Sequence, residues 1–198
     1  MIMLFFSKYK KINRGLSLIE ASMVLALSAI VVSGVLYYYN NTSSNRKLVE
    51  DSKTIQMVIS TIRTLYENQR PETTIDTAAV ATSGNFKTKD VNGKKYIVMP
   101  TGEALNIISG SRYWSNRMYA IDFFTSDKNI CSHLASMKYG TSHFATEVSD
   151  KTGKVTDVIT LLKKPATDRY LTVDKAAKEC SSKIGSSGTA RVYMAFKG

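Results

Sequence analysis

The chain contains little proline, histidine or cysteine: three, two and two residues among 198. Together with only eleven glycines, this excludes a collagen-like chain and a disordered chain rich in proline and glycine. The two histidines form no HExxH motif and no Cys/His cluster, so no metal-binding site is expected. The stretch Gly185-Ser186-Ser187-Gly188 lacks the lysine of a phosphate-binding loop and is expected to be a turn. We therefore expect neither an enzyme nor a bound cofactor.

Charge is absent from the 19 residues between Ala21 and Tyr39, although charged residues make up 22% of the chain. As a helix this run would be about 28 Å long, enough to cross the hydrocarbon core of a bilayer. The first fifteen residues carry four basic side chains and no acid, which predicts that they stay in the cytoplasm while the rest crosses the membrane. The run ends in three tyrosines rather than a small-residue cleavage site, so an uncleaved single-pass anchor is the simplest interpretation.

Glu20 does not fit a simple anchor. It lies inside an apolar stretch that begins at Leu16, where a carboxylate costs on the order of a few kcal/mol unless it finds a partner. An ionisable side chain in this position therefore indicates a function, and the question is which cation it meets.

The residues from Lys10 to Glu20 resemble the processing site of type IV pilin precursors, with a basic leader, a glycine, an apolar residue and a glutamate in fixed register. The resemblance implies that prepilin peptidase cuts between Gly15 and Leu16 and methylates the new α-amino group of Leu16. It also implies that Glu20 sets the assembly register by pairing with the N-terminal ammonium of a neighbouring subunit. Each charge alone would be strongly disfavoured in a low-dielectric fibre core, and only one axial stagger of identical helices pairs them.

A second helical pattern follows the apolar run. Apolar residues recur on one helix face between Asn45 and Gln69, and Pro71 then ends the pattern. The polar segment Asn40 to Ser44 leaves two alternatives, a linker or one long, locally bent helix, and we expect the helix. The apolar face consists of Leu48, Ile55, Val58, Ile59, Ile62, Leu65 and Tyr66. The expected organisation is a leader over 1–15, a membrane and fibre-core helix over 16–39, its amphipathic continuation over 40–70 and a globular head over 71–198.

The head is expected to have an α+β fold. Turn signals such as Asn92-Gly93 separate short runs rich in β-branched and aromatic residues. Strands are expected at 95–99, 118–125, 145–149, 155–162 and 190–196, with Asp150 to Gly153 as a hairpin connection. Helices are expected at 127–139 and 172–181.

Cys131 and Cys180 are the only cysteines, one in each of these expected helices. An even count in an exported domain favours a disulfide, and the alternative is a pair of unrelated buried thiols. A bridge would enclose 48 residues and contribute about 4 kcal/mol in the chain-entropy model. His133 lies two residues from Cys131, but we expect a disulfide cysteine beside a surface histidine and no reactive thiol–imidazole pair.

The cysteine-containing half is similar to the type IVb branch of the family, especially to the pilins of bundle-forming and thin pili. The similarity rests on Asn129 to Leu134 with Gly140-Thr141-Ser142, on Ala176 to Cys180 and on a closing strand near 190–196. It implies a long N-terminal helix packed on an antiparallel sheet that contains the C-terminal strand. The leader of 15 residues is shorter than in some members of the branch. The size of the chain is typical of a major subunit.

Basic and aromatic residues alternate from Arg112 to Tyr119, a pattern that can bind single-stranded nucleic acid. We expect instead that this segment leads into a strand, with Trp114 or Tyr119 packed in the core or at a subunit contact. Nucleic acid is therefore not an expected partner.

Two classes of function remain. The first is a subunit that polymerises with copies of itself into an extracellular pilus, after insertion into the inner membrane with its head in the periplasm. Its expected partners are prepilin peptidase and the inner-membrane assembly platform. Host cells or sister bacteria are candidate targets to which the fibre would bind. The second is a membrane-anchored binding module, such as a minor pilin or a pseudopilin, that binds DNA or a secretion partner.

Overall fold

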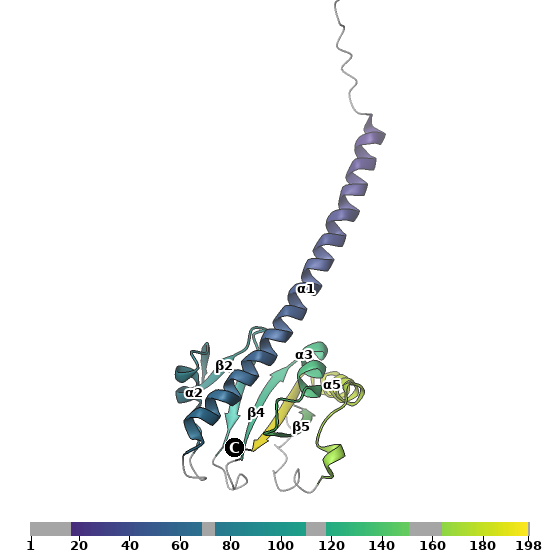
Figure 1. Cartoon of the computed structure of the whole chain (residues 1–198). Coiled ribbons are helices and arrows are strands. Elements are labelled where there is room, and N and C mark those ends of the chain that lie inside the picture. The colour runs from purple at the N-terminus through teal and green to yellow at the C-terminus, as the bar shows by residue number, and fades with distance from the viewer. Residues whose placement is uncertain (1–16, 69–73, 110–117, 151–163, 198) are drawn as a thin grey trace, which may run out of the picture. The chain divides into compact units, whose positions relative to one another are not determined.

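The computed structural model describes residues 17–68, 74–109, 118–150 and 164–197 (Figure 1). The chain divides into two compact units, residues 1–43 and 44–198. One helix, α1 (Leu18–Tyr66), contributes to both units and continues without interruption through Asn40 to Ser44. Of the two alternatives for residues 40–44, the structure confirms the long helix and not the linker. It ends at Tyr66, three residues before the predicted end at Gln69.

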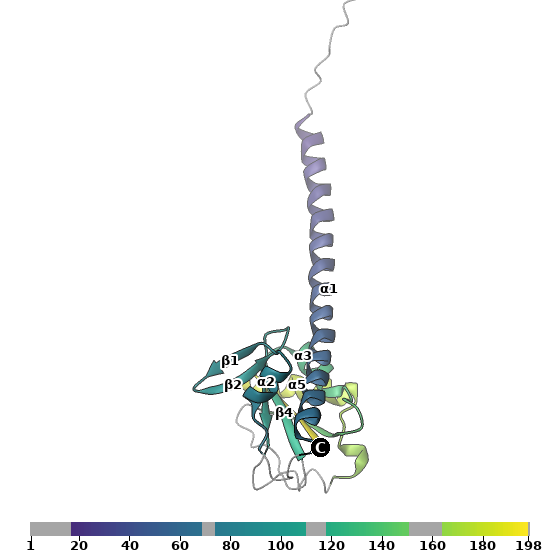
Figure 2. The ribbon, with the colours of Figure 1, turned by 60° about the vertical axis from the view of Figure 1, so that its left-hand side comes forward.

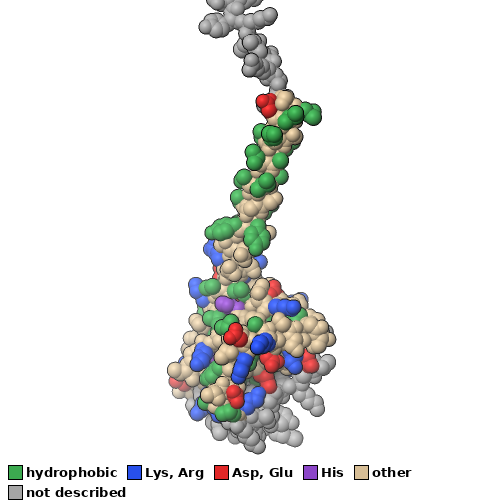
Figure 3. All heavy atoms as spheres, turned by 90° about the vertical axis from the view of Figure 1, so that its right-hand side faces the viewer, with side chains coloured by type: hydrophobic (Ala, Val, Ile, Leu, Met, Phe, Trp, Pro, Cys, Tyr) green, Lys and Arg blue, Asp and Glu red, His purple; other side chains and the backbone are tan. Residues whose placement is uncertain are grey.

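The first unit contains the apolar part of α1. Among the described residues, α1 is the one helix that is long and apolar enough to cross a membrane. The large apolar side chains of this part of α1, from Leu18 to Tyr39, are between 56% and 89% exposed. Figure 3 shows apolar side chains along the visible side of this part of the helix, whereas most of the acidic and basic side chains in view lie over the other unit.

The second unit is built on one antiparallel sheet of six strands in the order β1-β2-β3-β4-β6-β5. The strands are β1 (Thr88–Val91), β2 (Lys94–Val98), β3 (Ala104–Ile108), β4 (Met118–Thr125), β5 (His143–Asp150) and β6 (Ala190–Lys197). The C-terminal strand lies between β4 and β5, as the resemblance implied. The turn Asn92-Gly93 joins β1 to β2 with positive φ at both residues, the geometry that asparagine and glycine favour in tight hairpins.

Four helices pack on one face of this sheet: the second half of α1, α2 (Thr77–Ser83), α3 (Lys128–Ser136) and α5 (Val173–Ser187). Figure 2 shows α1 beside the sheet and the β1–β2 hairpin extending from the sheet edge. Ile55, Val58, Ile59 and Ile62 of α1 are buried in the common core, which confirms the predicted apolar face. Leu65 and Tyr66 pack partly buried against the same core.

Both predicted helices of the head are present, with capped starts. The side chain of Asp127 accepts hydrogen bonds at the start of α3, and Thr172 does the same for α5. The predicted turn at Gly185 to Gly188 is wrong, because α5 continues to Ser187 and ends at Gly188, whose φ is 72°. A glycine in this left-handed conformation is a common helix terminator. The short helix η1 (Ala166–Asp168) precedes α5.

The strands predicted at 95–99, 118–125, 145–149 and 190–196 correspond to β2, β4, β5 and β6. Strands β1 and β3 and helix α2 were not predicted. The strand predicted at 155–162 lies outside the described residues. Of the hairpin connection predicted at Asp150 to Gly153, only Asp150 is described.

Candidate assembly site

Glu20 lies in the first turn of α1, where it forms a reciprocal pair of hydrogen bonds with Ser17. The backbone N–H of Ser17 donates to Oε2 of Glu20 at 2.8 Å, and the backbone N–H of Glu20 donates to Oγ of Ser17 at 3.2 Å. The carbonyl of Ser17 also accepts the N–H of Ala21, which is the first hydrogen bond of the helix. This arrangement is a capping box, and the signal that could have indicated it is the pattern Ser-x-x-Glu in the sequence.

No cation accompanies this carboxylate among the described residues. The three ion pairs of the described chain lie in the head, and none of them includes Glu20. Arg46 is the next charged residue along the chain, 26 positions beyond Glu20. The negative charge at the start of α1 therefore needs a cation from outside the described part of the chain if it enters an apolar environment.

After Glu20, the surface of α1 is apolar apart from a few serines, and their hydroxyl groups bond within the helix. The hydroxyl groups of Ser22, Ser28 and Ser33 donate to the carbonyl oxygens of Ile19, Val24 and Ala29 in the same helix. These bonds leave no serine O–H in this stretch that needs a partner from the surroundings. The helix surface can thus be buried in lipid or among other apolar helices at little cost in polar groups.

The remaining predicted site residues have different outcomes. Gly15 and Leu16 lie outside the described residues. Cys131 and Cys180 form a disulfide that joins α3 to α5, with a Cα–Cα distance of 5.9 Å. His133 is exposed beside it, and no group of histidine, cysteine and acidic residues that could hold a metal occurs in the described ranges.

The head contains buried polar groups that the sequence did not indicate. Asp51 of α1 is fully buried and accepts hydrogen bonds from the N–H and hydroxyl of Thr101 in the β2–β3 connection. Burial raises the pKa of the Asp51 carboxyl, and the bonds from Thr101 oppose that shift. Nearby, burial also raises the pKa of Glu103, which accepts a hydrogen bond from Thr125. These bonds hold α1 and β4 to the same connection.

His143 is another buried titratable group of the head, and its role is structural. Its Nδ1 accepts the N–H of Tyr139, so Nε2 carries the proton and lies 3.1 Å from the carbonyl of Ala145 and 2.9 Å from the hydroxyl of Thr146. Burial lowers the pKa of His143 to about 4. The ring is therefore neutral near pH 7, and both nitrogens are occupied by protein partners.

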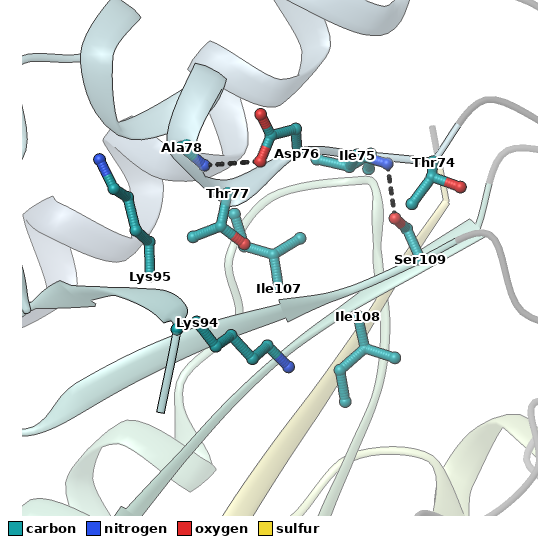
Figure 4. A pocket seen from close by; sticks show the side chains of 11 residues that line it. Thr74, Ile75, Asp76, Thr77, Ala78, Lys94, Lys95, Ile107, Ile108 and Ser109 are labelled. Carbon is teal, nitrogen blue, oxygen red and sulfur yellow. Dashed lines mark hydrogen bonds between the residues drawn. The ribbon is translucent and has the colours of Figure 1, made fainter. Parts of the chain in front are cut away.

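A cleft of about 650 Å³ opens where β2 and β3 separate (Figure 4). These strands pair at only two positions, and the pairing does not extend to Lys94 and Lys95 of β2 or to Ile107 and Ile108 of β3. The lining combines the two lysines with these isoleucines and with the segment from Thr74 to Ala78. The two lysines suit a small acidic group with apolar parts. Asp76 and Ser109 also line the cleft, and each accepts a backbone N–H, from Ala78 and Ile75 respectively.

The segment predicted as a nucleic-acid candidate is described only at its end. Tyr119 is buried in β4 and stacks on Phe196 of β6, with ring centroids 5.3 Å apart, as expected for a core residue. Arg112 to Arg117 lie outside the described residues.

Comparison with known proteins gives consistent matches. Residues 40–197 match the family described as bundlin. The major structural subunits of the bundle-forming pilus from Escherichia coli O127:H6 (strain E2348/69 / EPEC) and from Escherichia coli O111:H- are each 34% identical to this chain over 137 residues, which cover 67% of this chain and 69% of each relative. A solved type IV b pilin from Salmonella typhi has a similar fold, with a TM-score of 0.52 at 11% identity, over 75% of this chain and 98% of that one.

Proposed function

Because this chain belongs to the bundlin family and is a type IVb pilin, we propose that it is the major structural subunit of a type IVb pilus. Its family consists of structural subunits, so the protein is not an enzyme. In this proposal residues 1–15 are a leader that prepilin peptidase removes after Gly15, and the new N-terminus at Leu16 is methylated. Residues 16–39 span the inner membrane in the precursor and form the fibre core after assembly, 40–70 continue the helix, and 71–198 form the head.

The observation that carries this proposal is the lone carboxylate of Glu20 at the start of an exposed apolar helix. A buried charge without a partner is strongly disfavoured, whereas a pair of opposite charges removes most of each other's penalty. Cleavage after Gly15 creates an ammonium group at Leu16. Identical helices that pack with a stagger can then place the ammonium of one subunit beside Glu20 of its neighbour, and this pair sets the axial register.

The proposal also assigns partners and location. The precursor lies in the inner membrane with its head in the periplasm, and the mature subunit lies in an extracellular fibre. Prepilin peptidase and the inner-membrane assembly platform act on it, and host cells or sister bacteria are the candidate targets of the fibre. Adherence, aggregation and conjugation are roles that this architecture would serve equally.

The alternative is a minor pilin or a pseudopilin that acts as an anchored binding module. The cleft between β2 and β3 is the observation that favours a bound ligand, because two lysines line it together with apolar residues. The similarity to two major structural subunits favours the first function. A major subunit must dominate the protein of sheared surface fibres, whereas a binding module would be rare in them.

The experiment that tests the proposal is Glu20→Val in a strain that carries the complete assembly machinery. We expect the variant to be cleaved, inserted and folded, yet to produce few or no pili, because the partner of the ammonium is lost. The measurement is fibre sheared from the cells against total processed subunit. Met23→Val, which changes an exposed apolar side chain on the next turn, is the matched control and should assemble normally. A wild-type fibre yield from the Glu20 variant would refute the register role.

A further inference from the structure

The carboxylate of Glu20 is already held in place before any neighbouring subunit is present. Its Oε2 accepts the N–H of Ser17, and the hydroxyl of Ser17 accepts the N–H of Glu20, so the two residues close a ring of hydrogen bonds. Within the described residues, no group donates to Oε1, so this part of the chain leaves one carboxylate oxygen open. The held conformation is therefore compatible with a second partner at the other oxygen.

A glutamate at this position would otherwise sample several rotamers. A long side chain loses rotamer freedom when it is ordered, and a binding partner that must order it first binds more weakly. A residue that orders the carboxylate in advance removes this loss from the assembly step. Ser17 is placed for this role, because it is the N-cap position of α1 and touches Glu20 through both its backbone and its side chain.

We propose that Ser17 is a positioning residue for pilus assembly, which holds Glu20 so that its open oxygen receives the N-terminal ammonium of an incoming subunit. This inference rests on the proposed function. Ser17 follows Leu16, so both hydrogen bonds of the capping box remain available after cleavage between Gly15 and Leu16. The bond from the Ser17 N–H also partly satisfies the carboxylate in the membrane before assembly, where an unbonded acid would be costly.

A purely structural role for Ser17 would act through the helix as a whole. The helix has 49 residues, and the loss of one N-cap bond affects its first turn. Insertion and folding of the head should therefore survive the substitution of Ser17. The effect of a positioning role is confined to the step in which Glu20 meets its partner, and a higher subunit concentration should overcome it.

The test uses the full chain in a strain with the assembly machinery and a titratable promoter. Sheared fibre is plotted against processed subunit in the membrane for wild type, Ser17→Ala, Ser17→Thr and Ser22→Ala. Ser17→Ala removes the hydroxyl that accepts the Glu20 N–H, and so loosens the first turn in which the Ser17 N–H holds the carboxylate. Ser17→Thr keeps that hydroxyl. Ser22→Ala is the matched control, because the Ser22 hydroxyl donates to the carbonyl of Ile19 in the same part of the helix without touching Glu20.

We expect Ser17→Ala to need roughly threefold to tenfold more processed subunit for half-maximal fibre, in line with the usual effect of an N-cap substitution, and to reach the same plateau. Ser17→Thr and Ser22→Ala should follow the wild-type curve within about twofold. An unchanged or improved curve for Ser17→Ala would overturn the inference. A smaller amount of processed subunit in the membrane, with no shift of the curve, would also overturn it. Ser17 would then act only in folding or cleavage.

Glu20→Gln separates this inference from the proposed function. The amide oxygen can still accept the Ser17 N–H, but the charge that pairs with the ammonium is gone. If Glu20→Gln assembles like wild type, the ion pair fails, and the role of Ser17 fails with it. If Glu20→Gln does not assemble while Ser17→Ala assembles normally, the ion pair stands and only the positioning role is lost.

Discussion

At the scale of single residues, the buried polar groups of the head make stability depend on pH. His143 is 2% exposed, and both of its ring nitrogens contact protein groups. Burial, with a smaller contribution from Lys138, lowers the pKa of His143 to about 4 from the usual 6.5. Between these values the unfolded chain binds the proton and the folded chain does not, so protonation favours unfolding.

We expect His143 to remove stability as the pH falls from about 6.5 to about 4, by about 3 kcal/mol in total. Asp51 and Glu103 act in the opposite direction, because burial raises the pKa of each and the folded state then takes up protons more readily. The measurement is urea unfolding of the detergent-solubilised chain against pH, for wild type and His143→Gln. The difference between the two curves isolates the histidine, and a difference that does not change with pH would contradict this expectation.

Asp122 and Arg191 form the most buried ion pair of the described chain. Asp122 is 1% exposed, and its Oδ2 lies 2.6 Å from a guanidinium nitrogen of Arg191. The amide of Asn106 donates to the other carboxylate oxygen at 2.8 Å. Arg191→Met should destabilise the head by about 3–5 kcal/mol, because it leaves a buried carboxylate without its cation.

The double variant Asp122→Asn/Arg191→Met is the control for that substitution. It removes both charges, so it should recover most of the lost stability in the same urea titration. Equal losses in the single and double variants would show that the arginine acts through its packing on Phe124, where its guanidinium lies 5.3 Å from the ring centroid, and not through its charge.

At the scale of elements, the disulfide between α3 and α5 ties two helices on the same face of the sheet. It encloses a segment that includes β5, which hydrogen-bonds to β6. Cross-linking residues 49 positions apart restricts the unfolded chain and contributes about 4 kcal/mol in the entropic model. That is a large share of the stability of a typical domain.

Cys131→Ser and Cys180→Ser should therefore each lower the amount of folded protein in the periplasm. The double variant should behave like the single variants, because each change breaks the same bond. Subunit abundance at equal expression is the measurement, and thiol labelling of the oxidised wild-type protein is the control. Labelling of both cysteines in that folded protein would contradict the expected role of the bond.

At the scale of the whole molecule, the first step of the proposed assembly is removal of the leader. A peptidase that cuts after a small residue should not accept a bulky one, so Gly15→Trp should accumulate as the full-length precursor in the membrane and form no fibre. Gly15→Ala keeps a small side chain and should still be cut. Mass spectrometry of the membrane and surface fractions reports the start of the chain directly, and normal fibres from Gly15→Trp would be evidence against the peptidase.

The sequence alone determined the features that depend on neighbouring residues. The uncharged run from Ala21 to Tyr39, Glu20 before it and the apolar face of α1 are local patterns, and the structure keeps the run and the face in one helix. The cysteine pairing was correct because only one intramolecular pair was available. The capping box of Ser17 and Glu20 is likewise a local pattern, Ser-x-x-Glu, and its two hydrogen bonds are present in the structure.

The tertiary structure decided what depends on distant partners. Strand β1 was not predicted because all four of its side chains are exposed, so it shows no apolar alternation and is recognised only by its pairing with β2. Asp51 is buried in α1 because Thr101, fifty residues further on, supplies its hydrogen bonds. The place of β6 between β4 and β5 likewise arises from pairing across the sheet, which a single stretch of sequence does not specify.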